Sequence, residues 1–172
     1  MGCGDTLLTL SANAKINLTL DILGTREDGY HEVAMIMQEI SLHDTLSMGK
    51  INQGISLTIA IEGQQGTLPA DESNLCWKAA ALVQKEYNLQ EGVEIHLTKR
   101  IPMAAGLAGG SADAAAVLKG MNHLFRLGMT EARLCELGAR LGSDIPFCIM
   151  GGTMLATGRG EVLTRLPGFP RL

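Results

Sequence analysis

The segment with the clearest chemical signal reads Pro102-Met103-Ala104-Ala105-Gly106-Leu107-Ala108-Gly109-Gly110-Ser111-Ala112. It follows a strand-like run and precedes an alanine-rich, helix-like run. Glycine allows positive φ and carries no Cβ, so backbone N–H groups can come close to an anion. A helix that begins after such a loop adds unpaired N–H groups and the positive end of its dipole. The segment therefore predicts a phosphate-binding loop, although a lone glycine-rich stretch is as often a tight turn that packs a helix on a strand.

Strands are expected to dominate the first half of the chain. Residues 93–97 alternate apolar and polar side chains, which is typical of a half-buried strand. Residues 7–23 indicate one long or bulged strand, or one arm of a hairpin, and the glycine-bounded segment 24–29 indicates a turn. Further strands are expected at 31–42, 44–48, 55–61, 147–150 and 153–157.

Helices are expected in the middle of the chain, at 74–87, 111–125 and 130–141. Ser111 and Thr130 are the candidate N-caps of the second and third helix, and Asp113 would be favourable in the first turn of the second. Residues 142–146 are expected to form a sharp loop. Because strands come first and helices follow, the pattern favours an α+β domain over a doubly wound α/β sheet.

Composition excludes several classes of protein. The 172 residues suit one domain, and a hydrophobic content of 46% allows a sizeable core. A net charge of −4 and an aromatic content of 3% argue against a nucleic-acid surface and against a base-stacking platform. No apolar run reaches the ~20 residues that span a bilayer. The four cysteines form no C-x-x-C pair, which favours buried or idle thiols in a reducing cytoplasm.

The glycine loop differs from the best-known phosphate-binding motifs. The chain has no G-x-x-x-x-G-K-[ST], no G-x-G-x-x-G, and neither V-A-I-K nor H-R-D. What remains is P-x-x-x-G-L-x-G-G-S-A between a strand and a helix, which resembles the ATP loop of the GHMP family of small-molecule kinases. Three more segments resemble motifs of this family, in the same order: Ala14-Lys15-Ile16-Asn17-Leu18, Arg26-Glu27-Asp28-Gly29-Tyr30-His31 and Leu141-Gly142-Ser143-Asp144-Ile145-Pro146-Phe147.

This resemblance implies both a fold and an activity. The fold would be an α+β domain similar to domain 2 of ribosomal protein S5, with a mixed sheet packed on one side by helices. Together the four motifs are similar to the branch of the family that phosphorylates the 2-hydroxyl of 4-diphosphocytidyl-2-C-methyl-D-erythritol in non-mevalonate isoprenoid (terpenoid) synthesis. ATP and Mg²⁺ would be the cofactors and this cytidine diphosphate-linked alcohol the substrate, with no nucleic-acid or membrane partner.

The resemblance places the catalytic pair at Lys15 and Asp144. Asp144 would act as general base on the acceptor hydroxyl, a role typically worth about 10²–10⁴-fold in rate. Lys15 would stabilise the negative charge on Asp144, on the acceptor and on the γ-phosphate. Without the motif, a lysine such as Lys15 is more often a surface cation. An aspartate such as Asp144, two residues before Pro146, is then more often a turn residue. That these two distant residues meet is implied only by the resemblance.

The resemblance also indicates which residues would bind the nucleotide. Residues 102–112 would bind the ATP phosphates through backbone N–H groups, and Ser111 could add its hydroxyl to a phosphate or to Mg²⁺ while it also caps the helix. Asn74 matches an adenine-contacting position, or else is simply a helix cap. Lys99 matches a residue that lines the nucleotide pocket, or else is a strand-end cation. No protein metal site is predicted.

The substrate pocket is expected around four positions. Tyr30 would stack on the cytosine, His31 would hydrogen-bond to its edge, and Asn17 would contact substrate beside Lys15. A Tyr-His pair after a turn is otherwise more often structural. Met37 stands where some members of the family have a Phe that sandwiches the cytosine. Methionine packs on a ring but stacks less specifically, so we expect a changed affinity for the base and the same reaction.

The resemblance also implies a domain boundary. Residues 1–160 would be the N-terminal, ATP-binding domain, and 161–172 the start of a linker to a C-terminal domain that this sequence lacks. We expect this chain to keep the fold and weak nucleotide binding, to turn over poorly, and to expose an apolar face where that domain docks. The alternatives are an impaired or inactive fragment of that kinase, a GHMP kinase for mevalonate, homoserine or a sugar, or a non-catalytic RNA-contacting module, which the negative charge disfavours.

Overall fold

The computed structural model describes residues 7–25, 29, 31–158 and 160–168. Six strands and four helices lie in this part of the chain. In chain order they are β1 (Leu8–Thr25), β2 (His31–Ile51), β3 (Ile55–Ile61), α1 (Leu75–Glu86), β4 (Gly92–Lys99), α2 (Gly109–Leu124), α3 (Glu131–Ala139), α4 (Ile145–Met150), β5 (Thr153–Gly158) and β6 (Val162–Arg165). The order confirms the predicted α+β class.

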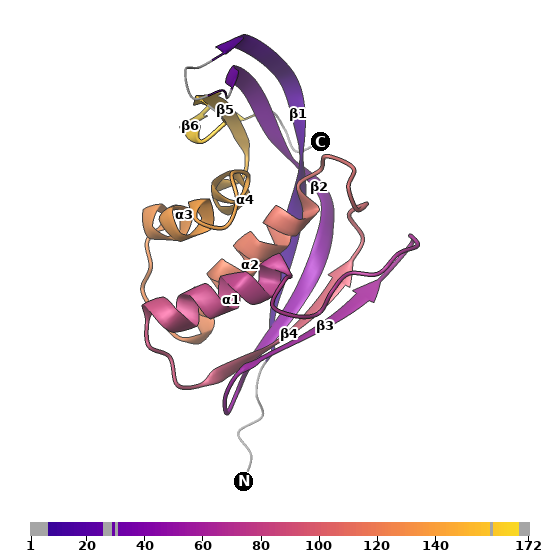
Figure 1. Ribbon diagram of the computed structural model, residues 1–172, viewed down its shortest axis with the longest axis vertical. Helices are drawn as coiled ribbons and strands as arrows, with labels where there is room; N and C mark the ends of the chain where they lie inside the picture. Colours follow the sequence, from indigo (N-terminus) through magenta and orange to yellow (C-terminus); the bar gives the residue numbers. More distant parts are fainter. Residues whose placement is uncertain (1–6, 26–28, 30, 159, 169–172) are drawn as a thin grey trace.

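The strands form one mixed sheet built around the long strand β2 (Figure 1). β1 runs antiparallel along one edge of β2, while β4 and β5 pair with successive parts of the other edge, at 45–51 and 33–38. β3 is parallel to β4, and β6 is antiparallel to β5. Register shifts interrupt the β1–β2 pairing at three places, which confirms the bulged strand expected over residues 7–23.

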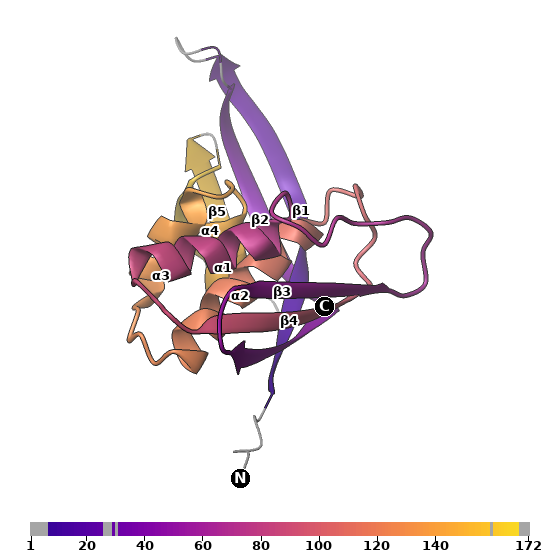
Figure 2. The same ribbon diagram turned by 60° about the horizontal axis from the view of Figure 1, so that its bottom comes forward.

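The helices cover one face of this sheet, as the two views in Figures 1 and 2 show. α2 packs on β1 and β2, and α1 and α4 both pack against α2. Between the layers, Leu46, Ile95, Leu118 and Met121 are fully buried. The predicted arrangement of a mixed sheet with helices on one side is therefore confirmed. Within the described ranges, no helix is long and apolar enough to cross a membrane.

The half of the β1–β2 hairpin farthest from the N-terminus projects beyond the helices (Figure 2). On β1 it leaves Leu20, Ile22 and Leu23 more than half exposed. The hairpin therefore carries apolar side chains at the surface, as would be expected of a face on which another domain docks.

Two local predictions were wrong. Residues 147–150 lie in the short helix α4 and not in a strand, because Pro146 occupies its first turn and its apolar side chains are buried. A short apolar run does not distinguish a buried strand from a buried helix. Helix α2 begins at Gly109, two residues earlier than expected, and its N-cap Ala108 makes no side-chain cap bond. Ser111 is therefore inside the first turn and is not the N-cap.

Other boundaries needed smaller changes. The segments expected as separate strands at 31–42 and 44–48 are one continuous strand, β2. The Thr130 side chain accepts from the N–H of Arg133, which confirms the cap predicted for α3. β6 pairs with β5 and so extends the sheet past residue 160, the expected boundary of the domain.

Close contact between α2 and the sheet depends on Gly120. A Cβ at this buried position would overlap the Met48 sulfur and would lie 2.9 Å from Leu10 Cδ1. We expect Gly120→Ala to lower the free energy of unfolding by about 1–3 kcal/mol, because overpacking outweighs the better helix propensity of alanine. Urea denaturation would measure the change. Gly110→Ala in the same helix is the control, since its Cβ would meet only Leu75 Cδ1 at 3.6 Å. Equal effects at the two positions would contradict the argument.

Candidate functional site

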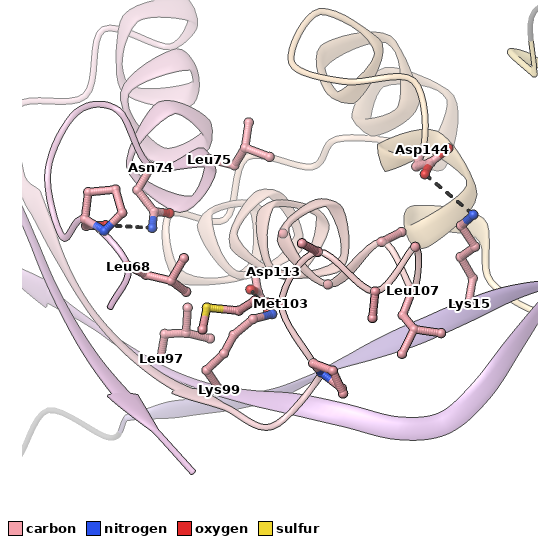
Figure 3. Close-up of a pocket in the computed structure, with 18 of the residues that line it drawn as sticks. Lys15, Leu68, Asn74, Leu75, Leu97, Lys99, Met103, Leu107, Asp113 and Asp144 are labelled. Atoms are coloured by element: carbon pink, nitrogen blue, oxygen red, sulfur yellow. Dashed lines mark hydrogen bonds and ion pairs between the residues drawn. The ribbon is translucent and has the colours of Figure 1, made fainter. Parts of the chain in front are cut away.

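A cavity of about 570 Å³ opens between the glycine loop and the ends of the helices (Figure 3). It is lined by Lys15, Leu68, Pro69, Ser73, Asn74, Leu75, Leu97, Lys99, residues 102–110, Asp113 and Asp144. Its size is in the range of small-molecule binding sites. Figure 3 shows that Leu68, Asn74, Leu75 and Leu97 lie at one end and Lys15 and Asp144 at the other. The cavity thus has an apolar end and a charged end, with the loop between them.

The loop between Ile101 and α2 has an unusual backbone. Ala104, Gly106 and Ala108 all have positive φ, at 56°, 75° and 55°. Positive φ at an alanine costs free energy and marks a conformation that the surrounding structure imposes. One constraint is a hydrogen bond from the Lys15 backbone N–H to the Leu107 carbonyl, at 3.1 Å. The loop is therefore attached to β1 at the residue whose side chain faces Asp144.

The N-terminus of α2 points its N–H groups toward this loop. The first backbone bond of the helix runs from the Ala112 N–H to the Ala108 carbonyl. The N–H groups of residues 109–111 consequently precede the intrahelical ladder and are free to bind an anion, to which the dipole of a 16-residue helix adds. This arrangement matches the phosphate-binding loop predicted from the glycines.

The strained alanines allow a direct test of this backbone. Ala108→Gly removes the Cβ from a residue with φ of 55°, so we expect it to raise the free energy of unfolding by about 0.5–1 kcal/mol. Ala105 is exposed in the same loop and is not among the residues with positive φ. Ala105→Gly is therefore the control and should lower stability slightly, because it only adds freedom to the unfolded chain. Thermal denaturation of both variants would decide, and a loss of stability in Ala108→Gly would refute the argument.

Lys15 and Asp144 meet at the charged end of the cavity. Lys15 Nζ lies 3.8 Å from Asp144 Oδ2 and donates to Asn17 Oδ1 at 3.0 Å. The Lys15 side chain is 8% exposed and that of Asp144 is 35% exposed. Although Asp144 is the N-cap residue of α4, its carboxylate makes no cap hydrogen bond. A separation of 3.8 Å is too long for a direct hydrogen bond, but a hydroxyl oxygen can lie about 2.8 Å from both groups.

Lys99 lines the cavity wall but is held by two carboxylates. Its Nζ donates to Asp44 Oδ2 on β2 and to Asp113 Oδ2 on α2, the second at 2.9 Å. Burial alone lowers the pKa of Lys99, but Asp113 and Asp44 raise it above its ordinary value, so the ammonium keeps its proton. Burial also raises the pKa of Asp113 to about 8, against the opposing effect of Lys99. Within the described ranges, Asp113 Oδ1 is buried and has no hydrogen-bond partner.

Residues that the sequence reasoning missed hold the start of the loop. Asp44 Oδ1 accepts from the backbone N–H groups of Arg100 and Ile101. The Gln64 amide donates to the Ile101 carbonyl at 3.1 Å and accepts from the Met103 N–H at 3.0 Å. The available signal for Asp44 was an aspartate at the start of the strand expected over residues 44–48. Nothing in the polar segment around Gln64 distinguished that residue from its neighbours.

At the apolar end, Asn74 serves as a helix cap and also lines the cavity. Its Oδ1 accepts from the Cys76 N–H at 2.8 Å, and its Nδ2 donates to the Pro69 carbonyl at 2.8 Å. The cap role left open by the sequence is confirmed. The amide is thereby fixed beside Leu68, Pro69 and Leu75, where a flat, apolar ring would fit.

Several predicted residues do not line the cavity. Ser111 and Ala112 lie within α2, the second of them buried, and neither is among the lining residues. Met37 is 1% exposed and packs with Phe147 and Met154. Its place in a cytosine pocket is therefore corrected: its side chain faces the core, because β2 turns this position toward α4. His31 is exposed at the start of β2, opposite Thr25 and far along the hairpin from Lys15.

Of the two other residues predicted to contact substrate, the structure describes only Asn17. Asn17 is exposed next to the Lys15–Asp144 pair. Tyr30 and Cys3 lie outside the described residues.

The cysteines are not suited to nucleophilic chemistry. Burial raises the pKa of Cys76 and of Cys135, and raises that of Cys148 to about 12, so these free thiols are poor nucleophiles. Over the described ranges, no group of three His, Cys, Asp or Glu side chains could hold a metal ion.

The chain is similar to known kinases along almost its whole length. A 4-diphosphocytidyl-2-C-methyl-D-erythritol kinase of Acetivibrio thermocellus is 53% identical over 162 residues, which cover 94% of this chain and 56% of that protein. A protein of the same name from Synechococcus sp. (strain JA-2-3B'a(2-13)) is 60% identical over 158 residues, with coverages of 92% and 50%. The chain therefore spans about half the length of the curated relatives it matches.

Solved structures and a family model agree with these relatives. A crystal structure of 4-(cytidine 5'-diphospho)-2C-methyl-D-erythritol kinase superposes with a TM-score of 0.80 at 38% identity, over 92% of this chain and 55% of that one. Homoserine kinase from Cytophaga hutchinsonii shares the fold, with a TM-score of 0.73 at 19% identity over 97% of this chain and 53% of that one. The family model described as GHMP kinases N terminal domain matches residues 74–152, from the cap of α1 to the turn before β5. Over most of its length, this chain is therefore similar in sequence and fold to the N-terminal half of GHMP kinases, and residues 74–152 match the N-terminal domain of that family.

Proposed function

We propose that this chain is the ATP-binding part of a cytoplasmic 4-diphosphocytidyl-2-C-methyl-D-erythritol kinase, which transfers the γ-phosphoryl group of ATP to the 2-hydroxyl of its substrate in non-mevalonate isoprenoid synthesis. The observation that carries the proposal is the Lys15–Asp144 pair, 3.8 Å apart at one end of the cavity that the glycine loop lines. The names of the relatives at 53% and 60% identity support the choice of substrate.

The lining of the cavity supports the following arrangement of nucleotide and acceptor. The adenine would fit the apolar end beside Asn74 and Leu75, and the phosphates would lie against the loop and the first N–H groups of α2. The acceptor hydroxyl would lie between Asp144 and Lys15. Asp144 would then accept the hydroxyl proton as the oxygen attacks the γ-phosphorus and the bond from that phosphorus to the bridging oxygen of ADP breaks. Lys15 would stabilise the charge on the transferring group.

The site would bind Mg²⁺ only together with the nucleotide, whose phosphate oxygens would supply most of the ligands. The charged end offers one carboxylate, that of Asp144, and Mg²⁺ in such sites is commonly held by phosphate oxygens, waters and one or two carboxylates. When bound there, the ion would neutralise the charge of the β- and γ-phosphates.

The residues for the cytidine part of the substrate rest on the family motif. We propose Asn17 as a substrate contact because it lies beside Lys15 on β1, and Tyr30 with His31 as the cytosine contact. His31 lies on the projecting hairpin and not in the cavity, so the base would bind outside the nucleotide cavity. We also propose that the ATP-binding domain continues through β6, to Arg165.

A substrate panel tests this function. We would measure transfer from γ-labelled ATP to 4-diphosphocytidyl-2-C-methyl-D-erythritol, mevalonate, homoserine and galactose. The protein would be this chain, alone and joined after Gly168 to the part of the Acetivibrio thermocellus relative that lies beyond the match. We expect product only from the cytidylylated substrate. Product from mevalonate, homoserine or galactose would assign the chain to another GHMP kinase, and none from any substrate in the joined protein would overturn the proposal.

A further inference from the structure

The two ends of the glycine loop converge on one buried ammonium group. At the start of the loop, Asp44 binds the backbone N–H groups of Arg100 and Ile101 and also the Lys99 ammonium. At the end of the loop, Asp113 of α2 binds the same ammonium at 2.9 Å. The Lys99 side chain is 4% exposed, and the Asp44 side chain is 0% exposed. Solvent therefore screens these contacts little, and loss of Lys99 would leave the buried carboxylate of Asp44 without its ammonium partner.

Gly109 is a glycine because of this ammonium. A Cβ at position 109 would lie 2.6 Å from Lys99 Nζ and 3.0 Å from Ile101 Cγ2. Gly109 is the first residue of α2 and is not among the glycines with positive φ, so its backbone conformation does not require glycine. The close approach of Lys99 does. This glycine of the loop motif thus serves an internal contact, whereas Gly106 has the positive φ that a turn requires.

We propose that Lys99, Asp44 and Asp113 form a clasp that positions the glycine loop, and that Lys99 acts through the loop and not as a ligand of the nucleotide phosphates. The carboxyl groups of Asp44 and Asp113 already bind the ammonium, which is enclosed between β2 and α2. Lys99 is therefore a positioning residue. The part of this inference that concerns nucleotide affinity rests on the proposed function, while the part that concerns loop order does not.

Amide hydrogen exchange in the nucleotide-free chain tests the clasp directly. We expect Asp113→Ala to raise exchange about tenfold at Ala112, whose N–H donates to the Ala108 carbonyl at the end of the loop. Residues 100 and 101 should change less than twofold, because Asp44 still binds their N–H groups. Lys99→Met should raise exchange at both ends. A general loss of stability would instead raise exchange along all of α2 and β4. That result, or no change at Ala112, would overturn the proposal.

A double-mutant cycle identifies the partner of Gly109. We expect Gly109→Ala to raise loop exchange about tenfold beside Lys99 but less than twofold in the Lys99→Met background, since the overlap with the ammonium is then gone. Gly110→Ala, whose Cβ would meet nothing closer than 3.6 Å, is the control for exchange and should have no effect in either background. Equal effects of Gly109→Ala in the two backgrounds would contradict the clasp. If Lys99→Met does not fold, the Asp113→Ala result decides alone.

Nucleotide binding completes the test. Calorimetry with a non-hydrolysable ATP analogue should show about tenfold weaker binding by Asp113→Ala than by the unmodified chain. If Lys99 instead binds phosphates directly, Lys99→Met should lose affinity progressively from AMP to the ATP analogue while loop exchange stays unchanged, and the clasp would be refuted. If the unmodified chain binds no nucleotide, the proposed function fails on its own, and the exchange data still decide about the clasp.

Discussion

Replacing Asp144 by Asn is expected to lower kcat for phosphoryl transfer by about 10²–10⁴-fold, the usual contribution of a general base. The amide keeps the shape of the side chain at the mouth of the cavity but cannot accept the hydroxyl proton. Since Asp144 makes no cap hydrogen bond to α4 and is 35% exposed, the change should leave stability within about 0.5 kcal/mol. The assay would use the joined protein with ATP and the cytidylylated substrate.

Binding separates this chemical role from a positional one. Affinity for a non-hydrolysable ATP analogue, measured without Mg²⁺, should stay within about twofold in Asp144→Asn, because we propose that this carboxylate contacts the acceptor hydroxyl and not the nucleotide. Lys15→Ala should also lose kcat. Glu136→Gln, which changes a carboxylate on the exposed face of α3, is the matched control and should leave kcat unchanged. A kcat for Asp144→Asn within threefold of the unmodified protein would remove Asp144 from the mechanism.

The second large effect is a dependence of stability on pH through Asp113. Its pKa is about 8 in the folded chain and close to the ordinary value of ~3.9 when unfolded. Between these values the folded state holds a proton that the unfolded state has released. This contribution to stability is therefore complete below about pH 4 and lost as the pH rises through 8. In the middle of the window, around pH 5–7, its slope is about −1.4 kcal/mol per pH unit.

The difference between the unmodified chain and Asp113→Asn isolates this effect. The charged and titratable groups that face Asp113 are Lys99 on β4, Asp44 on β2, Cys76 on α1 and Cys148 on α4. Burial or neighbouring carboxylates hold the pKa of Lys99 and of both thiols above the window.

Urea denaturation from pH 4.5 to 8.5 should give a difference that shrinks as the pH rises. Asp71→Asn is the control, because hydrogen bonds from Ser73 lower the pKa of Asp71 and move its contribution to lower pH. Parallel curves for the unmodified chain and Asp113→Asn would contradict the prediction.

Most of the fold could be predicted because its signals are local. From Val93 onward, strand β4 alternates between buried and less buried positions, and α3 begins at a threonine cap. The wrong secondary-structure predictions arose where the local sequence pattern does not distinguish the alternatives. Residues 147–150 are apolar throughout, so only packing against the core decides that they are helical. The early start of α2 follows from the αL conformation of Ala108, which no propensity of alanine indicates.

The functional site likewise has one part that the sequence could predict and one part that it could not. Its charged end could be predicted because Lys15 and Asp144 each stand within a short contiguous motif. The buried support of the loop could not, since Asp44 and Asp113 are far apart along the chain and only the fold brings both to Lys99. Met37 shows the opposite error. Its position in a motif suggested a pocket, but the face of β2 on which it lies determines that it is buried.

The hydrogen bond between the Lys15 N–H and the Leu107 carbonyl has a thermodynamic consequence. It joins the strand that carries Lys15 and Asn17, the residues proposed to contact the acceptor, to the loop that would receive ATP. Fixing one side in a single conformation would thus remove part of the freedom that the other side must lose. The two proposed ligands would then be coupled, and coupling is reciprocal: the factor by which bound ATP would strengthen binding of the acceptor equals the factor by which bound acceptor would strengthen binding of ATP.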